Sequence, residues 1–245
     1  MNYVVYRLAG KELVKSTCLY LVISSIVAYL FYDSIYAYII LIFFLPVFLK
    51  EIGKRLCKER IVTLENQFVE MIGCISSSLS AGLSVENAFI ESRKDMAKMF
   101  SDKSFIVIEL DEMIKGLKVN IPLMTSLAEF SKRTGSDDIN DFVTVFCEAS
   151  KSGGNLIEII KNTVSMMQDK KHTEDEISAM LKGKLLEQKV VCIIPFLIFA
   201  YLRISSREFI GVLYHNLVGI VVMSVCLAIY VTSIFISEKI VNIKV

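Results

Sequence analysis

The sequence predicts an all-α, polytopic membrane protein with about four transmembrane helices, arranged as two hairpins that flank a cytoplasmic antiparallel helical bundle. Hydrophobic residues make up 54% of the 245 residues, and the mean hydropathy is +0.55, although 22% of the residues are charged. These facts agree because the charges are segregated: residues 16–49 contain one charged residue and residues 190–236 contain three. Segregation of this kind indicates membrane spans around a polar domain.

The same segregation predicts the domain organisation. We expect five regions: a cytoplasmic N-terminus at 1–15, a transmembrane hairpin at 16–49, a cytoplasmic helical domain at 50–189, a second transmembrane hairpin at 190–236 and a cytoplasmic C-terminus at 237–245.

The first apolar run, Thr17 to Leu49, is too long for one membrane helix, because it has about 33 residues and a span needs about 20. The polar triplet 32–34 would divide it into two helices, and Pro46 would kink the second one near its end. In the second hairpin, the turn 203–208 separates an apolar segment that begins at Val190 from a longer one that ends at Ile236.

Basic residues predict the orientation. They precede the first and third apolar segments and follow the second and fourth, whereas the first turn, around Asp33, has none. The positive-inside rule therefore places both termini and the middle domain in the cytoplasm. Arg203 and Arg207 in the second turn are mild evidence against this orientation.

Cap chemistry predicts where the helices of the middle domain begin. Ser84 would cap a helix through Met96, and either Ser101 or Asp102 would cap the next one, which ends near Lys115. Pro122 would open a helix that ends near Arg133. The last two helices would begin at Ser136 and at Asn155, and the final one would continue past Glu187 into the third span.

Glycines mark the expected helix ends, at Gly82, Gly116, Gly135 and Gly153-Gly154, and we expect a positive φ at Gly154. Between these ends, apolar residues follow helical spacing, which is typical of the core faces of a bundle. Two such faces are Phe68, Ile72, Ile75 and Leu79, and Ile139, Phe142, Phe146 and Ala149.

Motifs of catalysis are missing from the sequence. It has no GxxxxGK[ST], HExxH or GxSxG, and its two histidines, His172 and His215, are far apart. The six cysteines are scattered, so we expect neither a disulfide nor a zinc site. We therefore expect no enzyme activity, no catalytic residues, no cofactor and no metal, and the near-neutral middle domain argues against nucleic-acid binding.

The acidic runs Glu109–Glu112 and Glu174–Glu176 are interpreted as solvated helix faces, with an acidic docking surface as the alternative. The spans carry no charged residue near mid-depth, which disfavours a transporter. A channel lined by serine and threonine, and a membrane-tethered signalling or adaptor protein, stay open as alternatives.

Two stretches of the sequence resemble a known family. The first is Gly82-Leu83-Ser84 with Ala88, and the second runs from Phe130 through Thr134-Gly135-Ser136 to Gly153-Gly154-Asn155-Leu156. They resemble the F-domain platform proteins of type II secretion and type IV pilus systems, and most of all the tight-adherence (Flp, type IVc) branch, over about Leu64 to Pro195. The residues of the family motif in this chain are Gly82, Thr134, Gly135, Gly153, Gly154, Asn155 and Leu156.

The resemblance implies an inner-membrane platform for a Flp/Tad pilus or a type II-like pseudopilus, which couples a cytoplasmic secretion ATPase to pilin extraction. The implied partners are this ATPase, the pilin, the lipid bilayer, and either a paralogous platform subunit or a second copy, because larger relatives carry two F domains. We interpret the acidic residues Asp137, Asp138, Asp141 and Glu148 as a candidate docking face. Stabilisation of the helix dipole is the alternative role of the first two.

Overall fold

The computed structural model describes residues 3, 10–32, 35–152, 156–205 and 216–241. The structure is 91% helical, and the described ranges contain no strand, so the predicted all-α class is confirmed. The chain divides into two compact units. We call Met1–Arg7 with Gly53–Thr173 the helical unit, and Leu8–Ile52 with Glu174–Val245 the membrane unit.

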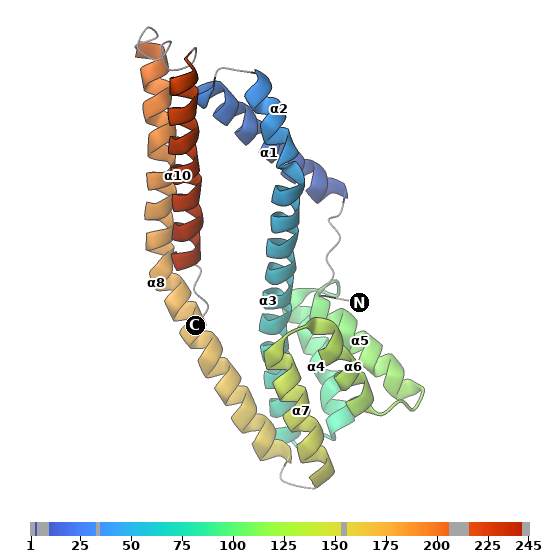
Figure 1. The fold of residues 1–245 in the computed structure, drawn as a ribbon. Helices are drawn as coiled ribbons and strands as arrows, with labels where there is room; N and C mark the ends of the chain where they lie inside the picture. Colours follow the sequence, from blue (N-terminus) through green and yellow to red (C-terminus); the bar gives the residue numbers. More distant parts are fainter. Residues whose placement is uncertain (1–2, 4–9, 33–34, 153–155, 206–215, 242–245) are drawn as a thin grey trace. The chain divides into compact units, whose positions relative to one another are not determined.

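The helical unit is built from consecutive helices joined by short turns. The elements are α3 (Leu45–Ser80), α4 (Val85–Phe100), α5 (Phe105–Lys118), α6 (Leu123–Thr134), α7 (Asp137–Ser152) and the first part of α8 (Leu156–Ser205). Figure 1 shows α4, α5, α6 and α7 grouped beside the C-terminal half of α3. This arrangement agrees with the bundle that the helical spacing predicts.

Two of the predicted helix starts follow from local chemistry alone and are confirmed. Ser84 caps α4, and its Oγ accepts a hydrogen bond from the backbone N–H of Asn87 at 3.4 Å. Pro122 directly precedes α6, where its missing N–H is not needed.

The predicted start of α5 at Ser101 or Asp102 is wrong, because the helix begins after Ser104. Ser101 has φ +83 and ends α4. The side chain of Ser104 makes no capping hydrogen bond. Instead, Oε1 of Gln67, on α3, accepts from the backbone N–H of Ile106 at 3.1 Å. A residue distant in sequence therefore satisfies the first turn of α5.

Gly116 does not end a helix as predicted, since α5 continues to Lys118 and the left-handed residue beyond it is Asn120, with φ +61. A Cβ at position 116 would lie 3.1 Å from Oγ of Ser126 on α6. The glycine is therefore explained by the close approach of two helices rather than by a cap.

Both predicted core faces are buried. The face of α3 and the face of α7 meet through aromatic rings: Phe68 and Phe142 make an edge contact at 5.3 Å, and Phe142 stacks on Phe146 at 5.7 Å. Burial of each such ring stabilises the fold by about 1.5–3 kcal/mol, so these contacts position α7 on α3.

The membrane unit contains α1 (Gly10–Phe31), α2 (Ile35–Phe43), α10 (Leu217–Val241) and the C-terminal part of α8. Within the described residues, three helices are long and apolar enough to cross a membrane: α1, α8 and α10. The predicted count of four is not confirmed. The second half of the first apolar run, which follows the polar triplet 32–34, forms the nine-residue α2 and then the start of α3, with a break at Phe44. Pro46 lies in the first turn of α3, where proline is tolerated, so the chain breaks before it and not after it.

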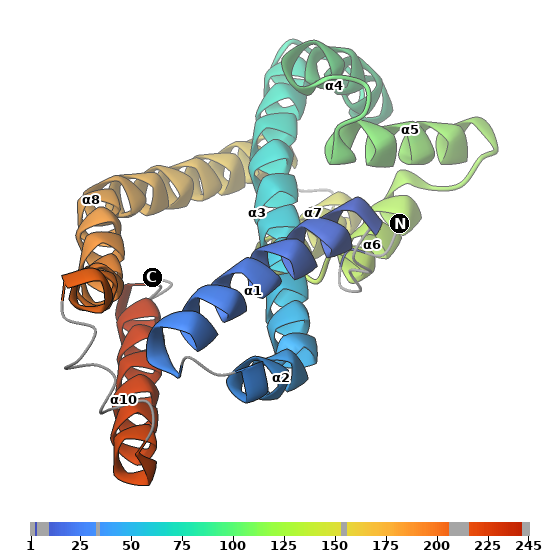
Figure 2. The same ribbon diagram turned by 90° about the horizontal axis from the view of Figure 1, so that it is seen from above.

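The C-terminal end of α1 packs against both α8 and α10. The ring of Phe31 contacts Phe196 at 6.0 Å and Phe199 at 4.8 Å, and the hydroxyls of Tyr32 and Ser224 share a hydrogen bond of 2.9 Å. Figure 2 shows from above that the C-terminal end of α1 is directed toward α8 and α10. The predicted continuous helix from Leu156 into the apolar segment is confirmed as α8.

Candidate functional site

The turn between α6 and α7 contains the Thr134-Gly135-Ser136 part of the sequence motif. Gly135 ends α6 in the left-handed conformation, with φ +65. Oγ1 of Thr134 donates to the backbone oxygen of Ser131 at 2.7 Å and accepts from the N–H of Ser136 at 3.4 Å. Oγ of Ser136 accepts from the N–H of Ile139 at 3.4 Å, so it caps α7 as predicted. The motif therefore builds a tight, fully hydrogen-bonded turn.

Two further hydrogen bonds fix this turn on the rest of the unit. Oγ of Ser136, which is buried, donates to Oε1 of Glu65 on α3 at 2.6 Å. Oγ of Ser131 donates to Oδ1 of Asn140 at 2.9 Å and joins α6 to α7. Each link ties α7 to a neighbouring helix, which sets the direction of its acidic face.

The other motif residues are also part of turns or helix ends. Gly82 has φ +90 between α3 and α4, with open space around it, so backbone conformation alone requires glycine there. Gly153, Gly154 and Asn155, with the predicted positive φ at Gly154, lie outside the described residues. Leu156 is the first residue of α8.

The structure divides the four candidate docking carboxylates into two groups. Asp137, Asp141 and Glu148 are exposed on α7. Their spacing places them on one helix face, because residues 4 and 11 positions apart differ by about 40° or less around a helix. Asp138 instead accepts two hydrogen bonds of 2.7 Å from Nζ of Lys170 on α8. This ion pair fastens α8 to α7, a role that sequence spacing could not reveal.

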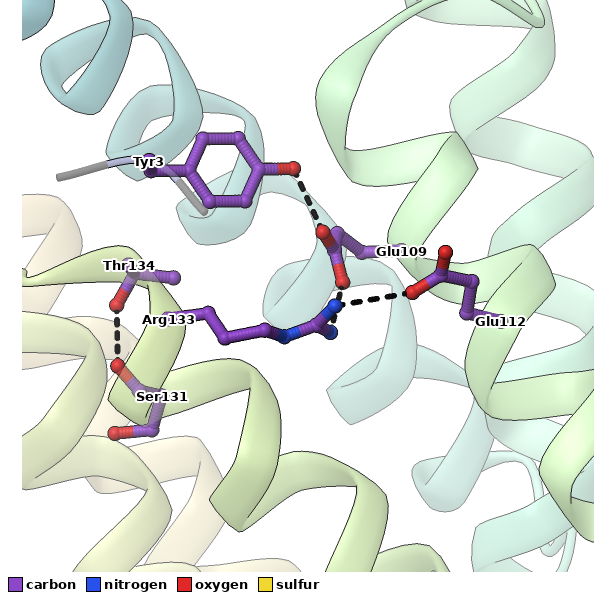
Figure 3. A network of polar contacts seen from close by, with 6 residues as sticks. All are labelled: Tyr3, Glu109, Glu112, Ser131, Arg133 and Thr134. Atoms are coloured by element: carbon purple, nitrogen blue, oxygen red, sulfur yellow. Dashed lines mark hydrogen bonds and ion pairs between the residues drawn. The ribbon is translucent and has the colours of Figure 1, made fainter. Parts of the chain in front are cut away.

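A second polar cluster surrounds Tyr3, which is 0% exposed (Figure 3). Its hydroxyl donates to Oε1 of Glu109 at 2.8 Å, and Nη2 of Arg133 donates to Oε2 of the same carboxylate at 2.6 Å. Nη1 of Arg133 also donates to Glu112 at 3.2 Å. Burial and the hydrogen bond to Glu109 raise the pKa of the Tyr3 phenol above its usual range, so Tyr3 stays a neutral donor.

This cluster corrects the interpretation of the acidic run 109–112 as a solvated face. Glu109 is completely buried, whereas Glu112 lies at the surface of the same helix. Asp111 also makes a specific contact: the Arg93 guanidinium donates to both its oxygens, at 2.9 and 3.2 Å, and this holds the pKa of that carboxyl below its usual value. Sequence reasoning missed Tyr3 and Glu109, because they are 106 positions apart and share no periodic pattern.

The part of the chain that the structure describes contains no group of three or more His, Cys, Asp or Glu residues placed to hold a metal ion. The six cysteines are free thiols, and burial raises the pKa of Cys74 and of Cys147. The candidate functional features of the described helical unit are therefore its exposed helix faces and the turns that orient them.

An all-α chain with apolar helices long enough to cross a bilayer, joined to a unit of amphipathic helices, is an integral membrane protein. The sequence model of the family described as "Type II secretion system (T2SS), protein F" matches residues 71–203, which is more than half of the chain. The chain belongs to this family. No curated protein and no solved structure gives a significant match.

Membership gives the general class of function. The chain is a platform-type protein of type II secretion or type IV pilus systems, and the family consists of non-catalytic membrane proteins. Family members work with secretion ATPases and with partner platform proteins. The matched residues begin within α3 and end within α8, so they include the α6–α7 turn and the acidic face of α7.

Proposed function

We propose that this protein is an inner-membrane platform of the tight-adherence (Flp/Tad) pilus branch, or of a type II-like pseudopilus, and that it couples a cytoplasmic secretion ATPase to pilin extraction. The observation that carries the proposal is α8, a single helix of 50 residues that belongs to both units. A helix of this length extends about 75 Å. It can therefore transmit a movement of the helical unit to the apolar segment in which it ends.

The start of α8 is fastened to the helical unit by several contacts. Ile160 and Val164 are buried in its core, and two ion pairs, Lys170 with Asp138 and Lys171 with Glu70, join it to α7 and α3. Because both charge and apolar contacts hold this end, a force on α7 acts on α8 directly.

The position of Tyr3 supports the proposed topology. Tyr3 is buried in the core of the helical unit, so the N-terminus and this unit lie on the same side of the membrane. The chain between them must then cross an even number of times. Since α1 is one candidate span, the apolar run of α2 and the start of α3 supplies the second crossing. This supports a first transmembrane hairpin, with the N-terminus and the helical unit on the same side of the membrane. We propose from the basic residues that flank the spans that this side is the cytoplasm, with both termini and domain 50–189 there.

We propose the exposed face of Asp137, Asp141 and Glu148 as the contact with a basic surface of the ATPase. These carboxylates project from a helix that α3, α4, α6 and α8 hold in place, so a partner meets a rigid, pre-oriented surface. Asp138, the fourth candidate, pairs with Lys170, so we propose that it contributes less to this contact than the other three. The second F domain of the working assembly would come from a paralogous platform subunit or from a second copy of this chain.

The test is charge reversal with a matched control. The test variant carries Asp137→Lys and Asp141→Lys. The control variant carries Glu86→Lys and Glu129→Lys, which change the net charge by the same amount at exposed positions on α4 and α6. We expect only the first pair to reduce co-purification of the ATPase from membranes several-fold and to make the remaining association less sensitive to salt, because fewer attractive charge pairs are left for salt to screen. Equal retention of the ATPase by both double variants would remove the α7 face from the mechanism.

A further inference from the structure

Arg133, the residue directly before the motif turn between α6 and α7, is held by its backbone and by its side chain. The N–H of Tyr3 donates to the backbone oxygen of Arg133 at 3.1 Å, so it supplies a donor to one of the carbonyls at the end of α6. The guanidinium of Arg133 donates to Glu109 and Glu112 on α5, at 2.6 and 3.2 Å. Because the Tyr3 hydroxyl donates to the same Glu109, Tyr3 contacts Arg133 both directly and through that carboxylate.

Further contacts join Tyr3 to two other helices of the helical unit. Sγ of Cys57, on α3, donates to the backbone oxygen of Tyr3 at 3.3 Å. The ring of Tyr3 makes an edge contact at 5.9 Å with Phe105, on α5, and the guanidinium of Arg60, on α3, lies over both rings. Tyr3 therefore lies where α3, α5 and the end of α6 meet, and it holds the end of α6 against both neighbours.

The hydroxyl of Tyr3 completes this arrangement. Glu109 is completely buried, and its two oxygens accept from different donors, Oε1 from the Tyr3 hydroxyl and Oε2 from Arg133 (Figure 3). A phenylalanine at position 3 would fill nearly the same volume and keep the backbone hydrogen bonds, but it would take one donor away from a buried carboxylate. Because a buried charge that loses a donor is costly, Glu109 would shift or admit water, and its contact with Arg133 would be disturbed.

We infer that Tyr3 is a positioning residue for the motif turn: by fixing Arg133 at the end of α6, it sets the direction in which α7 leaves the turn. Only three residues, 134–136, separate Arg133 from Asp137, the first residue of α7, so a shift at the end of α6 reaches α7 over a short, hydrogen-bonded connection. That the α7 face then meets an ATPase rests on the proposed function, whereas the positioning of the turn does not.

Amide hydrogen exchange of the full chain in detergent tests the inference with three variants. Tyr3→Phe removes the hydroxyl and is expected to raise exchange several-fold at 134–139, where the N–H groups of Ser136 and Ile139 bond to hydroxyls of the turn, but not in α4. A 4-aminophenylalanine at position 3 keeps a donor at the tip of the ring and should restore the slow exchange. Tyr32→Phe is the matched control, because it removes a tyrosine hydroxyl from a hydrogen bond in the membrane unit, and it should leave 134–139 unchanged.

Unchanged exchange at 134–139 in Tyr3→Phe, or a rise of equal size in α4, would overturn the inference, and so would failure of 4-aminophenylalanine to restore slow exchange. Co-purification of the ATPase from membranes is measured separately, and we expect Tyr3→Phe to retain several-fold less of it. Faster exchange at the turn together with full retention of the ATPase would support the positioning by Tyr3 and would count against the docking role of the α7 face.

Discussion

At the α6–α7 turn, the motif residues act through backbone geometry and hydroxyl groups. Gly135 is left-handed, Thr134 closes the turn, and Ser136 caps α7 while it contacts Glu65. The contacts of these side chains are all structural. They hold α7 at a set angle, which is why a motif without catalytic chemistry can identify a platform domain.

Gly135→Ala tests this account of the turn. An alanine with φ +65 is strained, so we expect a loss of about 1 kcal/mol and a fall of about 2–4 °C in the thermal midpoint of the full chain in detergent. Gly183→Ala is the matched control, since Gly183 is inside α8 with open space around it. Alanine there should raise stability slightly, because it favours the helix. Equal shifts at both positions would contradict the conformational explanation.

The Arg93–Asp111 pair predicts a pH dependence. Because the folded pKa of Asp111 is lowered from 3.8, its stabilisation is fully present above about pH 5 and is lost as the pH falls through 3.8 and below. Asp111→Asn should therefore be less stable than the unsubstituted chain at pH 6, with the difference shrinking toward pH 3. Thermal unfolding at several pH values measures this. A difference that is constant with pH would show that the carboxylate charge is not the cause.

At the scale of helices, the sequence predicted the helix starts that are determined by residues close in sequence. Ser84 and Ser136 were predictable as helix starts because each caps a backbone N–H three residues further on. Pro122 was predictable because a helix start does not need the N–H that proline lacks. The start of α5 was not, since several hydroxyl and acidic residues in 101–104 are equally suited, and Gln67, distant in sequence, settles the position. Long-range packing of this kind leaves no periodic trace.

The same limit explains what was missed in the candidate site. The exposed carboxylates of α7 follow from helical spacing. The ion pair of Asp138 with Lys170 and the contact of Tyr3 with Glu109 join residues 32 and 106 positions apart. A buried carboxylate also looks like any other member of an acidic run until its partner is known.

The continuity of α8 makes a prediction of its own. Gly183→Pro removes a backbone hydrogen bond and bends or breaks the helix in an exposed stretch, at about 3 kcal/mol, without touching either core. We expect normal membrane levels and normal ATPase co-purification, but loss of surface pilus or pseudopilus. Gly183→Ala should keep all three. Wild-type assembly by Gly183→Pro would contradict the transmission of movement along α8.

At the scale of the whole molecule, the segregation of charge was enough to predict an all-α membrane protein with a separate helical domain. The count of spans was less predictable. A run of apolar residues shows that a segment prefers lipid, but it does not show whether one helix, or a short helix followed by a longer one, carries the segment across. Backbone breaks such as that at Phe44 depend on a single proline and its neighbours.

The measurement that tests the central claim most directly is the side of the membrane on which the helical unit lies. Single cysteines at Asp33, Ser205 and Ser101 are treated in intact cells with a thiol reagent that does not cross the inner membrane, and labelling is compared with the parent chain. The account predicts new labelling at positions 33 and 205, and labelling at position 101 only after the membrane is opened. Labelling of position 101 in intact cells would place the unit outside the cytoplasm, away from any ATPase, and would contradict the account.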